Sequence, residues 1–310
     1  MVTSRKPVEP QGAARSGGSI NWRTLLLEAL AEARGVVGHI APAAGQRVVR
    51  GREAGYRPWD PEVIGVDTAT EQAVIGVLRR AGVQAYLYSE EAGVVELGRD
   101  KSAASTRGEP VCIVMDPFDG SLLYRRGIRA HWFTAIGIFR RNGEPRAAGI
   151  TDHITGEVIL ADASGAVRIT HPGAQPTLLR PAKTARLDGA AFEAYLMKPA
   201  FLYPTVTALR PIFGRAKLVL PNGGPGGFAD VACGRIDVYF AWNEALTEVF
   251  SSIFIAERAG CVITGWDGSP VRFRPDINAV HSLVCSANPR LHENVLQALR
   301  GITPPRGFQP

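Results

Sequence analysis

The sequence has few of the features that would place it in a membrane, a secretory route or a disulfide scaffold. No apolar run approaches the ~20 residues that a membrane-spanning helix needs, and the N-terminal segment lacks the apolar core of a secretory signal. Its cysteines stand far apart, without the spacing typical of zinc ligands, at Cys112, Cys233, Cys261 and Cys285. We therefore predict free thiols and a cytoplasmic protein with no membrane partner.

The sequence also has only a small excess of positive over negative charge. The net charge is only +6 in 310 residues, and no long run of Lys and Arg occurs. This charge suits the attraction of small anionic substrates better than the binding of nucleic acid. No repeat is present at periods of about 20–50 residues, which argues against a solenoid or a propeller. The 45% hydrophobic and 21% charged composition is that of a globular chain long enough for two closely packed domains.

Hydrophobic periodicity and turn residues predict a mixture of helices and strands. We predict helices over 20–37, from Thr68 to a Gly82 terminator, over 249–260 and over 289–301, with strands over 83–91 and 110–116 and an antiparallel meander over 132–169. A Pro-rich passage at 172–182 separates two halves. The predicted organisation is a disordered extension over 1–18, an N-terminal α+β metal-binding domain over 19–170 and a C-terminal α/β substrate domain over 171–310.

One turn carries two carboxylates at the end of an apolar strand. In "VCIVMDPFDGS", Pro117 and Gly120 specify a turn that places Asp116 and Asp119 three residues apart. Oxygen ligands of this kind suit Mg²⁺ or Mn²⁺. Glu90 ends an earlier strand in "YSEEAG" and is placed to reach the same ion. Taken alone, the turn is as typical of an ordinary loop, and the Glu pair is more typical of a solvated one.

The segments "DTATE", "SEE" and "DPFDGS", in this order, resemble the inositol monophosphatase and fructose 1,6-bisphosphatase superfamily of Mg²⁺-dependent, lithium-sensitive phosphatases, over roughly residues 20–300. The resemblance implies an α/β fold, a layered α-β-α-β-α sandwich of the sugar phosphatase type. It also implies a late metal-binding acid ahead of "ERAGC", which falls on Glu248. A Glu there is similar to the fructose 1,6-bisphosphatase branch. The alternative for Glu248 is an ordinary acid in the first turn of a helix.

The resemblance implies specific roles for these positions. One Mg²⁺ would be held by Glu90, Asp116 and the Phe118 carbonyl, and a second by Asp116, Asp119 and Glu248, with two or three ions, or Mn²⁺, per site. The implied catalytic residues are Asp67, Ser121 and Glu90, and the implied phosphate- or substrate-binding residues are Asp119, Gly120, Ser121, Gly223, Gly224 and Arg126. From the residues alone, Asp67 is more typical of a helix cap, and the glycines are as typical of a tight turn as of a binding loop.

The chain departs from the family pattern after the turn, in "LLYRRGIRAHW". Arg125, Arg126, Arg129 and His131 are candidates for contact with a second phosphate, or are simply solvated. The family's inositol-binding acid falls on Ala241, and Trp242, Asn243 and Glu244 are candidate pocket walls, although Trp242 is more typical of core.

The predicted function is hydrolysis of a small phosphorylated metabolite, fructose 1,6-bisphosphate or inositol 1-phosphate. The alternatives are a 3′-phosphoadenosine 5′-phosphate phosphatase and a non-catalytic binding or regulatory protein of the same fold. A homodimer or homotetramer is implied by analogy.

Overall fold

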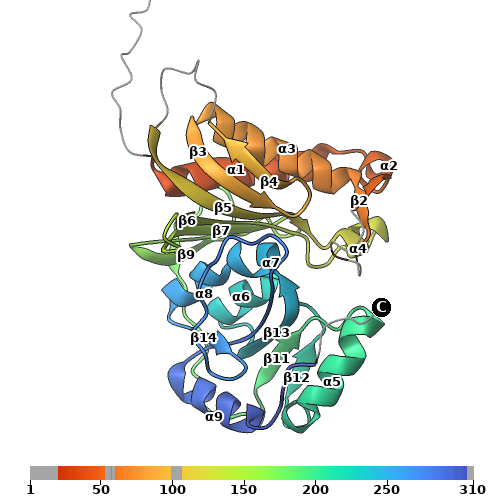
Figure 1. Ribbon diagram of the computed structural model, residues 1–310, viewed down its shortest axis with the longest axis vertical. Coiled ribbons are helices and arrows are strands. Elements are labelled where there is room, and N and C mark those ends of the chain that lie inside the picture. The colour runs from red at the N-terminus through yellow and green to blue at the C-terminus, as the bar shows by residue number, and fades with distance from the viewer. Residues whose placement is uncertain (1–19, 53–56, 58–59, 99–106, 306–310) are drawn as a thin grey trace, which may run out of the picture.

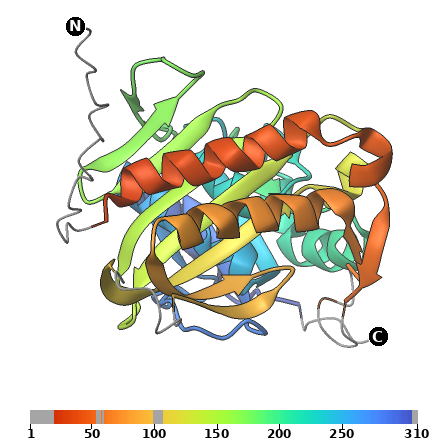
Figure 2. The same ribbon diagram turned by 90° about the horizontal axis from the view of Figure 1, so that it is seen from above.

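The computed structural model describes residues 20–52, 57, 60–98 and 107–305. These residues form five stacked layers of helices and sheets (Figure 1). Helices α1 (Trp22–His39) and α3 (Gly65–Arg80) lie side by side on the outer face of an eight-stranded sheet, as Figure 2 shows from above. A middle layer holds α6 (Pro225–Ala232), α7 (Leu246–Phe250) and α8 (Ile253–Ala259). Beyond a five-stranded sheet lie α5 (Pro199–Phe213) and α9 (Pro289–Leu299).

The eight-stranded sheet has the order β10-β9-β8-β7-β6-β5-β3-β4. Strands β3 and β5 are its parallel pair, and the other neighbours are antiparallel. Its strands are β3 (Val83–Ser89), β4 (Gly93–Leu97), β5 (Arg107–Asp119), β6 (Phe133–Arg140), β7 (Pro145–Asp152), β8 (Val158–Asp162), β9 (Gly165–Ile169) and β10 (Thr177–Leu178). Because β3 and β5 are parallel, their carboxyl ends meet at one edge of the sheet.

The five-stranded sheet has the order β12-β11-β13-β15-β14. It contains β11 (Ala191–Ala194), β12 (Leu218–Leu220), β13 (Val238–Ala245), β14 (Val262–Gly265) and β15 (Val280–Ser286). Shorter elements, which lie near the edge where β3 and β5 end, are α2 (Pro42–Gly45), β1 (Val48–Gly51), β2 (Glu62–Ile64) and α4 (Ser121–Arg125).

Hydrophobic clusters fill the spaces between the layers. On β5, Ile113 and Met115 pack toward α1 and α3, whereas Cys112 and Val114 pack toward the middle helices. Alternate side chains of a strand point to opposite faces, so β5 is buried on both, which accounts for its unbroken apolar run. A third cluster, which includes Phe240 of β13, joins the second sheet to α5 and α9. Burial of each large apolar side chain contributes about 1.5–3 kcal/mol.

A glycine lets the middle layer rest directly on the first sheet. A Cβ added to Gly137 of β6 would lie 2.1 Å from the carbonyl oxygen of Phe250 in α7. The backbones of β6 and α7 therefore touch without an intervening side chain. Since Glu248 belongs to the same short helix, this contact fixes its position relative to the end of β5.

The layered α/β fold predicted from the sequence is confirmed, as are the meander and the helix at the N-terminus, where Asn21 Oδ1 accepts a hydrogen bond from Thr24 N (3.1 Å). The four cysteines are free thiols, as expected. The division into two domains stays a prediction, and the first sheet extends to Leu178. The expected disordered extension lies outside the described residues. In the described part, no helix combines the length and the apolar character needed to cross a bilayer.

Three local predictions were wrong or incomplete. The single helix expected over 249–260 is two helices, α7 and α8, separated at Ser251 and Ser252, residues of lower helix propensity than Ala or Leu. Helix α3 begins at Gly65, ahead of Thr68, because the Asp67 carboxylate accepts the Ile64 amide. Helix α5 was not predicted, since Pro204 and Pro211 interrupt its pattern.

Candidate functional site

The end of β5 and the neighbouring end of β3 bring two predicted acids together. Ser89 pairs with Met115, so Glu90 and Asp116 follow at the same level of the sheet edge. Asp119 ends β5, and Glu248 approaches from α7. Glu90, Asp119 and Glu248 line one pocket, and Asp116 is buried close to them, at 1% exposure. The four acids predicted to hold metal therefore converge from three elements: the end of β3, the end of β5 and α7.

The Pro117–Phe118 turn is held rigidly. The pairing of β5 with β6 shifts register between Asp116 and Asp119, which turns both carboxylates out of the ladder. Thr134 Oγ1 donates a hydrogen bond to the Pro117 carbonyl (2.6 Å), and the Phe118 ring packs edge-on against Tyr124 at 5.2 Å between centroids. The Phe118 carbonyl, predicted to bind metal, is the more distant of two alternative acceptors for the single proton of the Ser121 hydroxyl, at 3.1 Å.

Asp67 and Ser121 are in direct contact. Ser121 Oγ donates to Asp67 Oδ1 at 2.6 Å, while Asp67 Oδ2 accepts from Ile64 N at 2.8 Å. The carboxylate thus supports the start of α3, as a helix cap does, and also contacts the pocket residue Ser121; its catalytic role stays a prediction. Burial raises the pKa of Asp67 to about 7, against the opposing effect of its hydrogen bond from Ser121.

The acids suit a hard cation. Asp116 Oδ1 and Asp119 Oδ2 are buried and accept no hydrogen bond from any described residue. Burial, together with the charges of neighbouring acids, raises the pKa values of both carboxyls well above their usual range. A divalent ion would be coordinated by these oxygens and would favour the ionised carboxylates. The oxygen chemistry of Asp116 and Asp119 therefore suits Mg²⁺ or Mn²⁺, which one or two carboxylates can bind with water as the remaining ligands.

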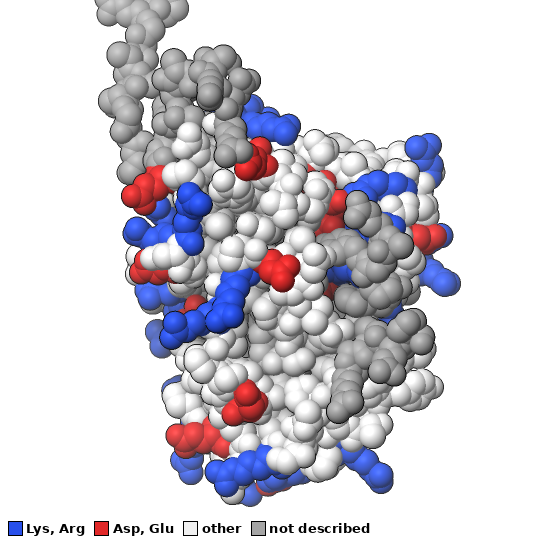
Figure 3. Space-filling view, in the orientation of Figure 1, with Lys and Arg blue, Asp and Glu red and all other residues white. Residues whose placement is uncertain are grey.

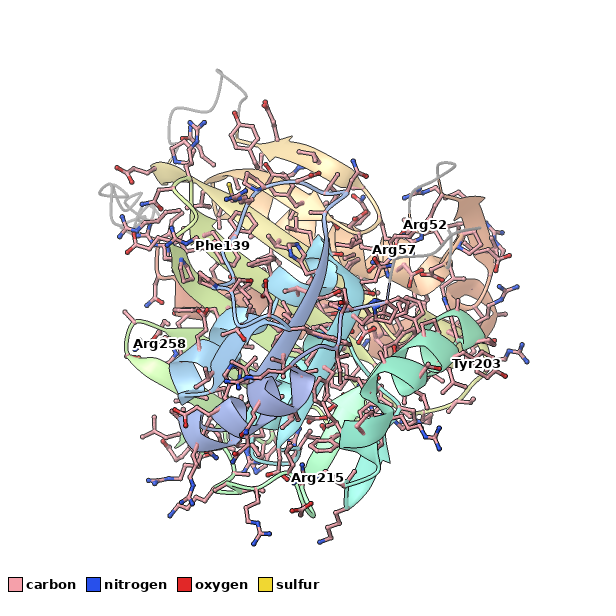
Figure 4. The ribbon with its side chains drawn as sticks, turned by 60° about the horizontal axis from the view of Figure 1, so that its bottom comes forward. Arg52, Arg57, Phe139, Tyr203, Arg215 and Arg258 are labelled. Carbon is pink, nitrogen blue, oxygen red and sulfur yellow. The ribbon has the colours of Figure 1, made fainter. Side chains whose placement is uncertain are left out.

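Two arginines that sequence reasoning missed also enter this cluster. Arg57 Nη2 lies 2.8 Å from Glu248 Oε1 and 3.3 Å from Glu90 Oε1. Arg52 Nη2 lies 2.9 Å from Glu90 Oε1 and 2.8 Å from Glu91 Oε1. Figure 4 shows both arginines on the same side of the molecule, away from Arg215 and Arg258. The sequence feature that could have identified these two arginines is the spacing of basic residues in "VVRGREAGYR", ahead of α3.

With these guanidinium groups in place, the acids do not form a compact ligand shell. Within the described ranges, no group of three or more His, Cys, Asp or Glu side chains has an arrangement that could hold a metal ion. The carboxylates are grouped in one pocket, yet Arg57 stands between Glu90 and Glu248.

The predicted phosphate-binding residues divide into two groups. Gly120, Ser121, Gly223 and Gly224 line the pocket with Asp119, whereas Arg126 does not line it and is exposed at the end of α4. The pocket cations are instead Arg57 and Lys198, and Lys198 Nζ lies 3.5 Å from Asp60 Oδ1. On the face seen in Figure 3, Lys and Arg side chains are interspersed with Asp and Glu rather than joined in one patch.

The glycine pair allows a close approach between the two halves of the pocket. Gly224 has φ 66, and a Cβ there would lie 3.3 Å from Asp119 Oδ2. A Cβ at Gly223 would lie 2.8 Å from Glu244 Oε1. Side chains at these positions would therefore displace the acids. The run predicted as a loop over 223–227 is in fact the loop and first turn of α6.

Glu244, a candidate pocket wall, is a buried acid of the pocket. Its Oε1 accepts hydrogen bonds from the Tyr239 hydroxyl and from Gly224 N (3.4 Å), and its buried Oε2 has no described partner. Burial raises its pKa well above the usual range, and Glu248 adds to the effect. Trp242 is core, at 3% exposure and packed edge-on against Phe201.

The five layers and the carboxylate-lined pocket define a protein of the sugar phosphatase fold. No model of a protein family matches the sequence. A curated fructose-1,6-bisphosphatase/inositol-1-monophosphatase of Methanothermobacter thermautotrophicus is 25% identical over 248 residues, covering 76% of this chain and 83% of that protein. The Nus factor SuhB of Xylella fastidiosa is 24% identical over 208 residues, covering 66% and 69%.

Solved structures agree with these relatives. The inositol monophosphatase of Anabaena (Nostoc) sp. PCC 7120 superposes with a TM-score of 0.67 at 22% identity, over 92% of this chain and 98% of that one. These comparisons support the superfamily of inositol monophosphatases and fructose 1,6-bisphosphatases, which the sequence motifs resemble.

Proposed function

We propose that the protein is a Mg²⁺-dependent phosphomonoesterase that hydrolyses a small sugar or polyol phosphate. The observation that carries the proposal is the meeting of Asp116, Asp119, Glu90 and Glu248 with the Asp67–Ser121 pair at one pocket. The relatives named as phosphatases support the same reaction class.

Each residue has a role in this proposal. Magnesium, when bound, supplies positive charge that lowers the pKa of water and offsets charge on the phosphate. Asp116 and Asp119, with Glu90 and Glu248 beside them, would hold it. Ser121 Oγ, which donates to Asp67, uses its oxygen to accept a hydrogen bond from the attacking water. Asp67, with a pKa raised to about 7, takes up the proton passed along this pair.

The pocket favours a hydroxyl-bearing substrate. Glu244 offers an unpartnered carboxylate oxygen, Asn222 offers an amide, and both line the pocket with Lys198. Carboxylates and amides accept the hydroxyl hydrogens of sugars and polyols, and Lys198 can face a second anionic group. Fructose 1,6-bisphosphate and inositol 1-phosphate are therefore the proposed substrates, in that order, because Glu248 occupies the late acidic position. Cytoplasmic location and a homodimer or homotetramer stay predictions.

The test is phosphate release from fructose 1,6-bisphosphate, inositol 1-phosphate and 3′-phosphoadenosine 5′-phosphate, each with Mg²⁺ and with a chelator. We expect release only with Mg²⁺, and the highest kcat/KM on one of the first two substrates. Asp116→Asn should abolish release while its circular dichroism matches the wild type. Phosphate release that persists in the presence of the chelator, or in Asp116→Asn, would contradict the proposal.

A second candidate is a non-catalytic binding protein of the same fold. The observation that favours it is the ion pairing of Arg57 with Glu248 and Glu90, which engages acids that a catalytic centre would use for metal. A relative named as a Nus factor points in the same direction. Failure of every substrate and of p-nitrophenyl phosphate, in the presence of Mg²⁺, would favour this candidate.

A further inference from the structure

The acids of the pocket divide into two pairs by what they contact. Glu90 and Glu248 share the guanidinium of Arg57, at 3.3 Å and 2.8 Å from Nη2. Asp116 Oδ1 and Asp119 Oδ2 are the buried carboxylate oxygens of the β5 turn that accept no hydrogen bond from any described residue. A cation is thus present beside one pair, whereas these oxygens of the other pair have no hydrogen-bond partner among the described residues.

The charge of Arg57 is permanent in this setting. A guanidinium stays protonated at any pH at which the protein is folded, unlike a buried amine. Its side chain is only 7% exposed, and its positive charge favours the ionised forms of Glu90, Asp116 and Asp119. It acts on the whole cluster, as a resident ion would.

Glu90 is engaged from two directions. Its Oε1 lies near both Arg57 Nη2 and Arg52 Nη2, the latter at 2.9 Å. Arg52 also donates two hydrogen bonds to the Glu91 carboxylate, from Nη1 to Oε2 at 2.9 Å and from Nη2 to Oε1 at 2.8 Å. Paired geometry of this kind is the strong form of the Arg–carboxylate interaction. Displacement of Arg57 by an ion would leave a buried guanidinium to be solvated elsewhere, which is costly.

We propose that Arg57 takes the place of one divalent ion, so that the chain binds a single Mg²⁺ at Asp116 and Asp119. The guanidinium supplies the second positive charge between Glu90 and Glu248. The inference rests on the proposed function, because it concerns the cofactor of the same pocket. It replaces the two or three ions expected from the family resemblance with one.

The stoichiometry can be counted without turnover. Mn²⁺, as a probe for Mg²⁺, is titrated into the full-length protein, and free Mn²⁺ is measured by electron paramagnetic resonance. We expect one tightly bound ion per chain in the wild type and two in Arg57→Gln, which keeps a polar side chain but removes the charge. Arg57→Lys keeps the charge and should bind one. Asp116→Asn should lose the wild-type ion.

Arg126→Gln is the matched control, because Arg126 is exposed and outside the pocket, and it should bind one ion. Two or more ions in the wild type, or one ion in a folded Arg57→Gln, would overturn the inference. If Arg57→Gln does not fold, the numbers of ions bound by the wild type and by Arg57→Lys still test the inference, because more than one bound ion in either protein contradicts it. No bound ion in the wild type would contradict the metal-dependent function itself.

Discussion

Ser121 Oγ donates a 2.6 Å hydrogen bond to Asp67 Oδ1, which joins the turn after β5 to a residue 54 positions earlier in the first turn of α3. The second oxygen of Asp67 is fixed by the Ile64 amide at 2.8 Å. Both oxygens of one buried carboxylate are therefore oriented, one toward the scaffold and one toward the pocket. A general base must be held within reach of the proton that it takes up, and this arrangement would hold Asp67 in that way.

Asp67→Asn should lower kcat by roughly 10²–10⁴-fold, because an amide cannot take up the proton that a general base accepts. KM should change little, since Asp67 does not line the pocket. Steady-state kinetics on the best substrate measure both constants. Ser164→Ala, which removes an exposed hydroxyl far from the turn, should leave them unchanged. A kcat within threefold of the wild type would remove Asp67 from the mechanism.

The sequence predicted the acids well because their positions depend on local signals. Asp116 and Asp119 flank Pro117 in a turn, and Glu90 follows β3, so strand ends and turn residues placed these three acids at one edge, whereas the motif resemblance identified them as a site. Arg57 could not be placed in the same way. Its contact with Glu248 spans 191 positions, and a basic residue outside a regular element shows no period that would point it inward. Glu244 was named as a pocket wall, but its burial depends on the bulge between Ala241 and Glu244 on β13.

Glu244→Gln should raise KM for the polyol or sugar phosphate by about 2–10-fold, because a hydrogen bond between neutral groups contributes about 0.5–1.5 kcal/mol. It should change kcat/KM for p-nitrophenyl phosphate little, since that substrate has no hydroxyls for Oε2 to accept. The readout is the ratio of the two kcat/KM values. Glu144→Gln, at an exposed turn, is the control. Equal losses on both substrates would show that Glu244 acts structurally rather than in recognition.

Gly137→Ala should destabilise the fold by about 1–3 kcal/mol, because the added Cβ would lie 2.1 Å from the Phe250 carbonyl and force α7 away from β6. Urea denaturation measures the change in the free energy of unfolding. Gly35→Ala is the control, and its effect should have the opposite sign. Gly35 lies in α1, and an added Cβ there would have no atom within 4 Å, so the substitution should raise the free energy of unfolding by about 0.5–1 kcal/mol. An unchanged midpoint for Gly137→Ala would contradict the direct contact of the two layers.

His292 of α9 should make stability fall in mild acid. Its ring nitrogens lie 3.0 Å from Ser286 Oγ and 3.0 Å from Thr264 Oγ1, and burial lowers the pKa of its imidazole below the usual 6.5. The unfolded chain therefore takes up a proton near pH 6.5 that the folded protein does not, so stability is retained above that pH and lost as pH falls through it. Thermal melts at pH 7.5 and pH 5.5 should show a smaller acid-induced drop in Tm for His292→Gln than for the wild type. His39→Gln, at an exposed position, should keep the wild-type drop. A drop for His292→Gln as large as that of the wild type would mean that another group causes the acid sensitivity.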